Sequence, residues 1–276
     1  MRQMGGGAHT AFGATARTAA VLSVVCLMSP RAGATAAEPG LTARYLALPP
    51  TPLPGLPAVA IRQIAASLYI HESHDARGVP SNGLVAVLGG GLLLVDTAWT
   101  DEQTARILDW GERTLGRKWI GAVITHEHAD RDGGLGTVLA RKIPVAALDF
   151  TVDRLEKRGV HGVAPLFAAG ARAGSRAFQD PRGFEAFFPG PGHAPDNVVL
   201  WFPAQQVLFG GCLIKSASAD SLGFTGDADL AAWPEAVRRV AGRYHPILIV
   251  PGHGPIALGD AALRHTLDLL ATKTTK

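Results

Sequence analysis

Two histidines and an aspartate within five residues constrain the fold of this chain more than any other feature. His126, His128 and Asp130 directly follow the apolar run 120–124, whose composition is typical of a buried β-strand. Side chains at positions i and i+2 of an extended segment point to the same side, so both imidazoles can reach one metal ion. Imidazole suits zinc, and a nearby carboxylate adds a harder, anionic ligand. The segment predicts a metal site on a loop at the end of a strand.

Three further donors stand downstream, each in a glycine-rich setting where an expected strand ends. They are His193, Cys212 and His253. Glycine lets the backbone approach a metal closely, and loops after strands present their side chains from a rigid base. One zinc ion usually has about four ligand positions, so six donors imply two adjacent zinc ions, each with an open position for water. We therefore expect the strand ends that carry these donors to meet.

The first 37 residues differ in composition from the rest of the chain. They contain three arginines and no acidic residue, an apolar run over 19–28, and small residues over 32–37. This pattern is typical of a secretory signal, with cleavage expected between Ala34 and Glu38. A disordered basic tail is the alternative, but it leaves the apolar run unexplained. We expect residues 1–37 to be a signal peptide that is removed, and the mature protein to be periplasmic.

Removal of this leader would change both the charge and the cysteine count. The formal net charge of +3 would fall to about zero, and Cys212 would remain as the only thiol. Nothing then suggests a nucleic-acid-binding surface, and no apolar run approaches the roughly 20 residues of a membrane-spanning helix. Lipid attachment at Cys26 is disfavoured by the bulky Val25. We expect a monomer that binds neither nucleic acid nor, once processed, a membrane.

A lone cysteine in an oxidising compartment cannot form an internal disulfide. Cys212 is therefore either an inert buried residue, which is the commoner case, or a metal-bound thiolate. The two preceding glycines and the histidine-bearing loops favour the metal.

The chain becomes regular only after a proline-rich stretch. Residues 38–60 predict an extended arm, and a single domain is expected over 61–276. Expected strands cover 67–72, 84–88, 92–96, 118–124, 184–188, 197–202, 206–211 and 246–250. Expected helices cover 100–115, 132–141, 149–158 and 229–241, with a last one after Asp260. Because strands and helices alternate in two similar halves, we predict two sheets face to face with helices outside.

Six short segments carry the donors and their surroundings. They are residues 78–84 (GVPSNGL), 94–99 (LVDTAW), 125–134 (THEHADRDGG), 190–197 (GPGHAPDN), 210–215 (GGCLIK) and 251–254 (PGHG). Together and in this order they resemble subclass B1 of the metallo-β-lactamase superfamily, over roughly residues 61 to 270. The resemblance implies an α/β fold, the αββα sandwich, in which two mixed β-sheets lie face to face with helices on the outer faces. The metals would lie at one edge, between the sheets.

The resemblance also implies a zinc-dependent hydrolase of cyclic amides. Two zinc ions per chain are expected, one held by His126, His128 and His193, the other by Asp130, Cys212 and His253. A metal-bound hydroxide would open the amide of a small-molecule β-lactam and so confer antibiotic resistance, with carbapenems among the expected substrates. Asp130 would hold this hydroxide or relay a proton.

Two residues around the expected metals resemble supporting groups of the family. Asp96, at the end of a buried strand, resembles the carboxylate that orients the metal loop by hydrogen bonds, and we count it with Asp130 as catalytic. A simple cap of the strand end explains Asp96 equally well on local grounds. Arg131 is expected to face the second zinc and to pair with Asp130 or a backbone carbonyl, and an exposed surface arginine is the alternative.

Three residues are expected to bind substrate. Lys215, three residues after the cysteine, matches the family's anchor for the substrate carboxylate, and Asn197 is also expected to bind substrate. Phe224 stands where the family often has an asparagine, and a phenylalanine cannot donate a hydrogen bond. Residues 71–78 are expected to form a mobile hairpin over the site. This hairpin is unusually polar, and its His74 is expected to be solvated and not a metal ligand.

Two other functions stay open at this point. One is a thioesterase on the same scaffold, because fold alone does not fix the substrate. Thioesterases of the glyoxalase II type typically carry a histidine where this chain has Arg131 and a bridging aspartate instead of Cys212. The other is a non-catalytic zinc-binding protein, which would favour closed, fully protein-ligated sites. Export and the pairing of Cys212 with Lys215 favour the β-lactamase.

Overall fold

The computed structural model describes residues 49–54, 58–166 and 177–273. The expected leader, and the part of the expected arm before residue 49, lie outside these ranges. Within them, no helix has the length and apolar character needed to cross a membrane.

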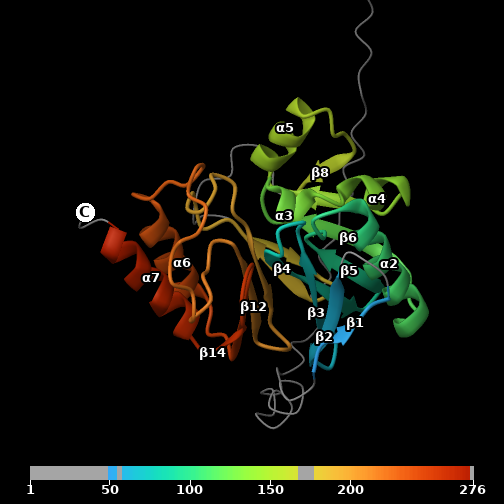
Figure 1. Ribbon diagram of the computed structural model, residues 1–276, viewed down its shortest axis with the longest axis horizontal. Coiled ribbons are helices and arrows are strands. Elements are labelled where there is room, and N and C mark those ends of the chain that lie inside the picture. Colours follow the sequence, from blue (N-terminus) through green and yellow to red (C-terminus); the bar gives the residue numbers. More distant parts are fainter. Residues whose placement is uncertain (1–48, 55–57, 167–176, 274–276) are drawn as a thin grey trace, which may run out of the picture. The chain divides into compact units, whose positions relative to one another are not determined.

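The first sheet comprises eight strands of the described chain, which lie in sequence order from β1 to β8 (Figure 1). They are β1 (Thr51–Pro52), β2 (Val59–Ala65), β3 (Leu68–His74), β4 (Pro80–Leu88), β5 (Gly91–Val95), β6 (Trp119–Ile124), β7 (Val145–Ala147) and β8 (Val163–Pro165). Strands β1 to β5 pair antiparallel, and β5 to β8 pair parallel. Parallel pairs need crossover connections, and helices supply them here.

The second sheet has six described strands in the order β14-β13-β12-β11-β10-β9. They are β9 (Ala177–Asp180), β10 (Phe184–Phe187), β11 (Val199–Phe202), β12 (Val207–Gly211), β13 (Leu248–Pro251) and β14 (Ala257–Leu258). Only β12 and β13 pair parallel among them. Both sheets are therefore mixed, as the resemblance implied.

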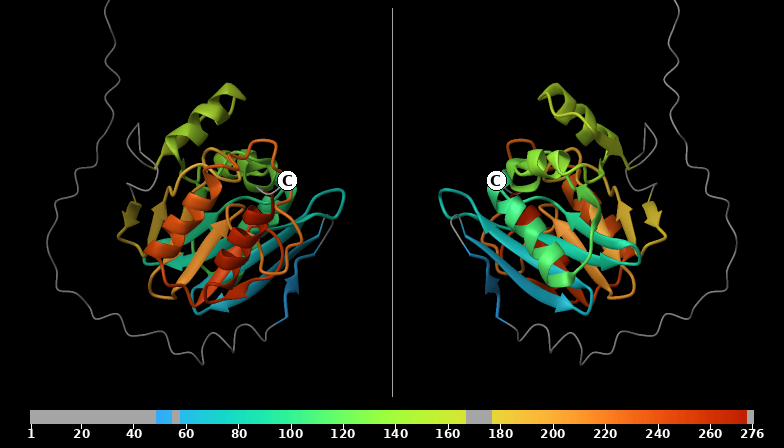
Figure 2. Two further views of the ribbon diagram at one scale, coloured as in Figure 1. Left: turned by 90° about the vertical axis from the view of Figure 1, so that its left-hand side faces the viewer. Right: turned by 90° about the vertical axis from the view of Figure 1, so that its right-hand side faces the viewer.

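Helices cover the outer face of each sheet. On the first sheet they are α2 (Asp101–Leu115), α3 (Ala129–Asp132), α4 (Leu135–Ala140) and α5 (Asp149–Lys157), and on the second α6 (Trp233–Arg243) and α7 (Ala261–Lys273). From left to right, Figure 1 shows α7 and α6, the second sheet, the first sheet, and α2 with α4. The side views in Figure 2 show α6 and α7 in front of one sheet and α2 in front of the other. The predicted αββα arrangement is confirmed.

Three apolar clusters fill the gaps between these layers. The central one joins both sheets through residues such as Leu84, Phe202 and Phe209. Strand β5 shows why its sequence is apolar throughout: alternate side chains point to opposite faces, so both faces must be buried. Leu93 packs in the central cluster, and Leu94 packs under the helices of the first sheet.

Helix α2 begins and ends as its sequence predicts. Thr100 precedes it in extended conformation, and its side chain accepts a hydrogen bond from the backbone N–H of Gln103 at 3.2 Å. Gly116 closes it with a φ of 63°, which suits glycine. Both ends of α2 are therefore fixed by local contacts. The segment that follows the expected metal ligands packs against this helix.

The short strands β7, β8, β9 and β14 were not expected from the sequence, and two longer segments also differ from the expectation. Part of the expected arm belongs to the sheet, because β1 pairs with β2 and β2 already begins at Val59. Proline is compatible with an edge strand, so a proline-rich stretch does not exclude pairing. The expected helix over 132–141 is divided into α3 and α4, with Gly133 and Gly134 between them. The end of the metal motif, with Asp130, therefore lies in the short helix α3.

Gly134 makes the close contact between this break and the start of α2. A Cβ at Gly134 would lie 1.8 Å from Oγ1 of Thr104 and 2.7 Å from the carbonyl oxygen of Thr100. We expect Gly134→Ala to lower the free energy of unfolding by about 1–3 kcal/mol, as overpacked sites do. Gly242 is the matched control, since it is exposed in α6 and a Cβ there meets nothing within 4 Å. Gly242→Ala should stabilise by about 0.5–1 kcal/mol in the same urea titration, so equal shifts in both variants would contradict the argument.

Candidate metal centre

The fold brings all six predicted donors to one edge of the two sheets. His126 and His128 follow β6, Asp130 lies in α3, and His193 lies between β10 and β11. Cys212 follows β12, and His253 follows β13. Parallel strands end at the same edge, so the pairing of β12 with β13 places the loops of Cys212 and His253 side by side.

Three imidazoles pack edge to face against one another. The ring centroids of His126 and His128 lie 4.7 Å apart, and those of His193 lie 5.2 Å and 5.1 Å from them. Nε2 of His193 is 3.2 Å from Nδ1 of His128. Three ring nitrogens therefore face a common space.

The other three donors form a second group beside the imidazoles. Oδ2 of Asp130 lies 3.2 Å from Sγ of Cys212 and 3.0 Å from Nε2 of His253. Sγ of Cys212 and Nε2 of His253 are 3.4 Å apart. A thiol, a carboxylate and an imidazole at such distances are a donor set that suits zinc.

The two groups are continuous with each other. The described chain contains three sets of donors, and within each set the ligand atoms lie within 4.8 Å of one another. The sets are His126, His193 and Cys212; His126, His128 and Asp130; and Asp130, Cys212 and His253. The sets share His126, Asp130 and Cys212. A single cluster of six donors results.

The chemistry of the donors fits a metal. Among the described residues, Nε2 of His126 is buried without a hydrogen-bond partner, which is rare for a polar atom. Burial lowers the pKa of His126 well below its usual value, and burial together with the Lys215 charge lowers that of His193 to about 2. Both imidazoles are therefore neutral at pH 7, the form in which histidine binds metals.

Arg131 is fully buried behind the donors. Its Nε and Nη2 reach Oδ2 of Asp130 at 2.9 Å and 2.8 Å, and Nη1 lies 3.3 Å from Oδ2 of Asp96. It also donates to the carbonyl oxygens of Asn82 at 2.5 Å and Gly252 at 2.8 Å. Burial alone would raise the pKa of Asp130, but the Arg131 and His253 charges hold that pKa well below its usual range. The carboxylate therefore stays ionised.

Asp96 acts through its neighbours. Its carboxylate accepts from the backbone N–H of Thr125 at 2.7 Å and from Oγ1 of Thr125 at 2.9 Å, at the start of the metal loop. Burial raises the pKa of Asp96 to about 7 although Arg131 opposes this. Asp96 has no exposed surface and does not line the cavity described below. We therefore correct its assignment from catalytic residue to positioning residue.

Sequence reasoning missed the contacts that hold the metal loop from outside. Nε2 of His128 lies 3.0 Å from Oδ2 of Asp227, and Nδ1 of His253 donates to the carbonyl oxygen of Pro80 at 2.6 Å. Such contacts fix the orientation of the imidazole and leave its other nitrogen for a metal. Asp227 is 99 residues from His128, and no local pattern connects the two.

Helix α5 also clamps the metal loop. Its Arg154 donates to Glu127 at 2.7 Å and lies 3.5 Å from Asp227. Arg158, the residue directly after this helix, pairs with Glu127 and, at 2.8 Å, with Asp132. The loop between His126 and Asp132 is thereby fixed on its outer side as well.

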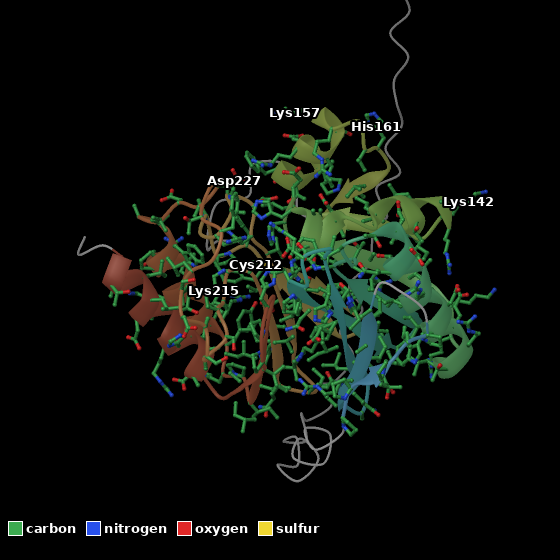
Figure 3. The ribbon with its side chains drawn as sticks, viewed as in Figure 1. Lys142, Lys157, His161, Cys212, Lys215 and Asp227 are labelled. Atoms are coloured by element: carbon green, nitrogen blue, oxygen red, sulfur yellow. The ribbon has the colours of Figure 1, made fainter. Side chains whose placement is uncertain are left out.

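A cavity of about 510 Å³ opens above the donors, with His128, Asp130, His193, Cys212 and His253 among its lining residues. Lys215, Phe224, Val79 and Arg77 also line it. Lys215 is mostly buried, and its Nζ lies 5.3 Å from the centroid of the Trp233 ring. Figure 3 shows Cys212 and Lys215 near the centre of the molecule and Lys142 and Lys157 at its periphery. Phe224 is 62% exposed, and its ring centroid lies 5.6 Å from that of His128.

Two expectations about the rim of the site need correction. Asn197 is 2% exposed and does not line the cavity, because its amide accepts from the N–H of Ala194 at 3.1 Å and donates to the carbonyl of Ala194. It braces the turn that carries His193 and does not face substrate. His71 is buried within β3, so only the turn after His74 can cover the site. His74 lies 3.6 Å from Glu72 and belongs to none of the described donor sets.

We expect Asp227→Ala to weaken zinc binding about 10- to 100-fold, because loss of an outer partner frees a ligating imidazole. Competition with a chromophoric chelator measures this directly. Asp220→Ala is the matched control, since Asp220 is exposed on the same loop and contacts none of the donors. Equal zinc affinity in the two variants would show that the His128 contact does not matter.

Comparison with known proteins gives one family. Residues 76–260 match the model of the metallo-β-lactamase superfamily. The type 2 metallo-β-lactamase of Bacillus cereus is 38% identical over 217 residues, which cover 77% of this chain and 82% of the relative. That of Bacteroides fragilis is 30% identical over 217 residues, covering 77% and 85%.

Solved structures agree with the sequence relatives. A metallo-β-lactamase from Pontibacter korlensis superposes with a TM-score of 0.70 at 36% identity, covering 77% of this chain and 99% of that one. A metallo-β-lactamase from Pseudomonas aeruginosa in a mono-zinc form gives 0.72 at 35% identity, covering 79% and 97%. With its His, Asp and Cys donors gathered at one sheet edge, the chain belongs to the metallo-β-lactamase superfamily, among the type 2 enzymes of subclass B1.

Proposed function

We propose that this chain hydrolyses the amide of β-lactams, carbapenems included, with two zinc ions. The observation that carries the proposal is the cluster of six donors beneath an open cavity of about 510 Å³. A structural zinc site is closed by protein ligands, whereas a catalytic site keeps a position open for water or substrate. The open cavity supports catalysis over a storage or structural role.

The two zinc ions would be divided as the family resemblance implies. His126, His128 and His193 would hold one, and Asp130, Cys212 and His253 the other. When bound, zinc makes a water molecule acidic near neutral pH and polarises a carbonyl oxygen. All six donors and Lys215 come from one chain, which supports a monomer as the working unit.

Hydrolysis adds the oxygen of water to the lactam carbonyl carbon, breaks the ring C–N bond and delivers a proton to the leaving nitrogen. Asp130 is suited to relay the proton from water to the leaving nitrogen. Its carboxylate lies in the cavity wall and, because it stays ionised beside Arg131, it is free to accept a proton. Lys215 is suited to the carboxylate that β-lactams carry, because its ammonium places a positive charge in the cavity wall. Contact with Trp233 limits the freedom of Lys215.

The rim of the cavity favours substrates with apolar substituents. Phe224 and Val79 are 62% and 37% exposed, and they reach the cavity from different loops. Neither can donate a hydrogen bond, so they offer substrate only apolar contact. The carbonyl oxygen of the lactam would then be polarised from the floor of the site or by a backbone amide.

Export to the periplasm is part of the proposal. It is supported by the arginines, the apolar run and the small residues within 1–37, and by the absence of acidic residues there. Mass spectrometry of the protein recovered from a periplasmic extract would give the cleavage point.

The decisive experiment compares three substrates on the purified protein. We expect turnover of a penicillin and a carbapenem with two zinc ions counted per chain, loss of activity in a chelator, and recovery on adding zinc. A glutathione thioester should not be turned over. Thioester cleavage without lactam cleavage would assign the chain to the other hydrolase class, and zinc binding without any turnover would make it a binding protein.

Lys215→Ala should raise KM for anionic lactams about 10- to 100-fold, since a hydrogen bond to a charged group contributes about 1.5–3 kcal/mol. We expect little change in kcat and no change in bound zinc. Lys157→Ala, on the exposed face of α5, is the control. Loss of zinc from the Lys215 variant would refute a pure anchoring role.

A further inference from the structure

His71 lies beneath the metal loop and takes no part in the chemistry described above. It belongs to β3, is 1% exposed, and its Nε2 lies 3.2 Å from the backbone carbonyl oxygen of Asp96. A carbonyl oxygen only accepts, so Nε2 carries the proton and donates. Burial lowers the pKa of His71 to about 4, and the imidazole is therefore neutral at pH 7.

The neighbouring strand leaves space for this contact. Gly83 of β4 pairs in register with His71. A Cβ at Gly83 would lie 2.2 Å from Nε2 of His71 and 2.7 Å from the carbonyl oxygen of Val95. Any larger residue at position 83 would displace the imidazole, so a glycine and a histidine on adjacent strands build the contact together.

The acceptor of this hydrogen bond is a strained residue. Asp96 has a φ of 58°, in the left-handed region that residues other than glycine seldom adopt. Its backbone N–H donates to the carbonyl oxygen of Val123 on β6 at 2.9 Å. The turn is thus held from both sides, by β6 at the N–H and by His71 at the carbonyl. Backbone strain of this kind persists only where the surrounding structure enforces the conformation, and strained residues are found most often at functional sites.

Contacts lead from Asp96 to the metal ligands along two short paths. Its carboxylate binds Thr125, which directly precedes His126. It also lies 3.3 Å from the guanidinium of Arg131, which holds Asp130. A rotation of the Asp96 turn would move both the start of the metal loop and the cation that orients Asp130.

We propose that His71 is a positioning residue of the metal centre: its Nε2–H fixes the strained Asp96 turn, and the turn places Thr125 and Arg131. The inference rests on the proposed function, in that the six donors must bind metal. A role in folding alone fits less well, because Nδ1 of His71 is buried and has no partner among the described residues. An apolar residue of similar size would avoid that unpaired nitrogen.

The test replaces the donor and then restores it. His71→Met removes the N–H at similar volume, whereas the side-chain amide of His71→Gln can donate near the place of Nε2. Binding of Co²⁺ in place of zinc reports on the centre, since a bound Cys212 thiolate gives a near-ultraviolet charge-transfer band. We expect His71→Met to lose at least about tenfold in Co²⁺ affinity with a weaker thiolate band. His71→Gln should recover most of both.

Gln103→Met is the matched control for simple loss of a buried hydrogen bond. Gln103 is fully buried and donates to the carbonyl oxygen of His74, on the same strand as His71, at 2.8 Å. We expect this variant and His71→Met to lower the urea midpoint of the metal-free protein equally. Only the His71 variant should change Co²⁺ binding.

The other outcomes contradict the inference. Native Co²⁺ affinity and band in His71→Met would overturn it, as would an equal loss in His71→Met and His71→Gln. If His71→Met fails to fold, His71→Phe supplies a second variant without the donor. Failure of both to fold would assign His71 to folding instead. If the native protein binds no Co²⁺ through Cys212, the proposed function itself fails.

Discussion

The rest of the site depends on the ion pairs and hydrogen bonds of the buried Arg131 guanidinium. A buried charge costs several kcal/mol unless it is paired and hydrogen-bonded, and Arg131 meets both conditions. Its partners are Asp96 after β5, Asp130 in α3, Asn82 in β4 and Gly252 after β13. Because these positions belong to both sheets, one cation fixes the edge where the sheets meet. Removing Asp130 would leave the buried charge with only the more distant carboxylate of Asp96 at 3.3 Å, so the segments must be placed together.

The charges and the burial at this edge also determine the protonation states of the donors. Arg131 favours the ionised form of Asp130, while burial favours the neutral forms of His126 and His193. Metals need a charged carboxylate and neutral imidazoles, and the fold provides the carboxylate and the neutral forms of His126 and His193. Burial alone would lower the pKa of His253, but Cys212 and Asp130 raise that pKa to about 10, so His253 must lose its proton when a metal binds. The outer contacts of His128 and His253, with Asp227 and the carbonyl of Pro80, then orient the rings. Charge and orientation are therefore set by different layers of residues.

Sequence reasoning recovered what local patterns encode and missed what depends on distant contacts. The donors were found because each follows an apolar run and glycines, and α2 was found from Thr100 and Gly116. Asp227 and Arg154 were missed because their partners lie far away in sequence. Asn197 was misassigned, since exposure cannot be read from a polar residue type alone. Likewise, a strand over 67–72 was expected, but the polar residues around His71 placed this histidine in a mobile hairpin, whereas it is buried in β3.

The floor and the rim of this site are under different physical constraints. Floor residues such as Asp130 and Cys212 are buried among charges and ligand atoms, so a substitution there disturbs metal, loop and sheet edge together. Phe224 and Val79 lie on exposed loops and contact the cavity without holding it in place. A phenylalanine where the family often has an asparagine is therefore compatible with an intact metal centre. Substrate preference can change at the rim of such a fold while the hydrolytic chemistry of the floor stays the same.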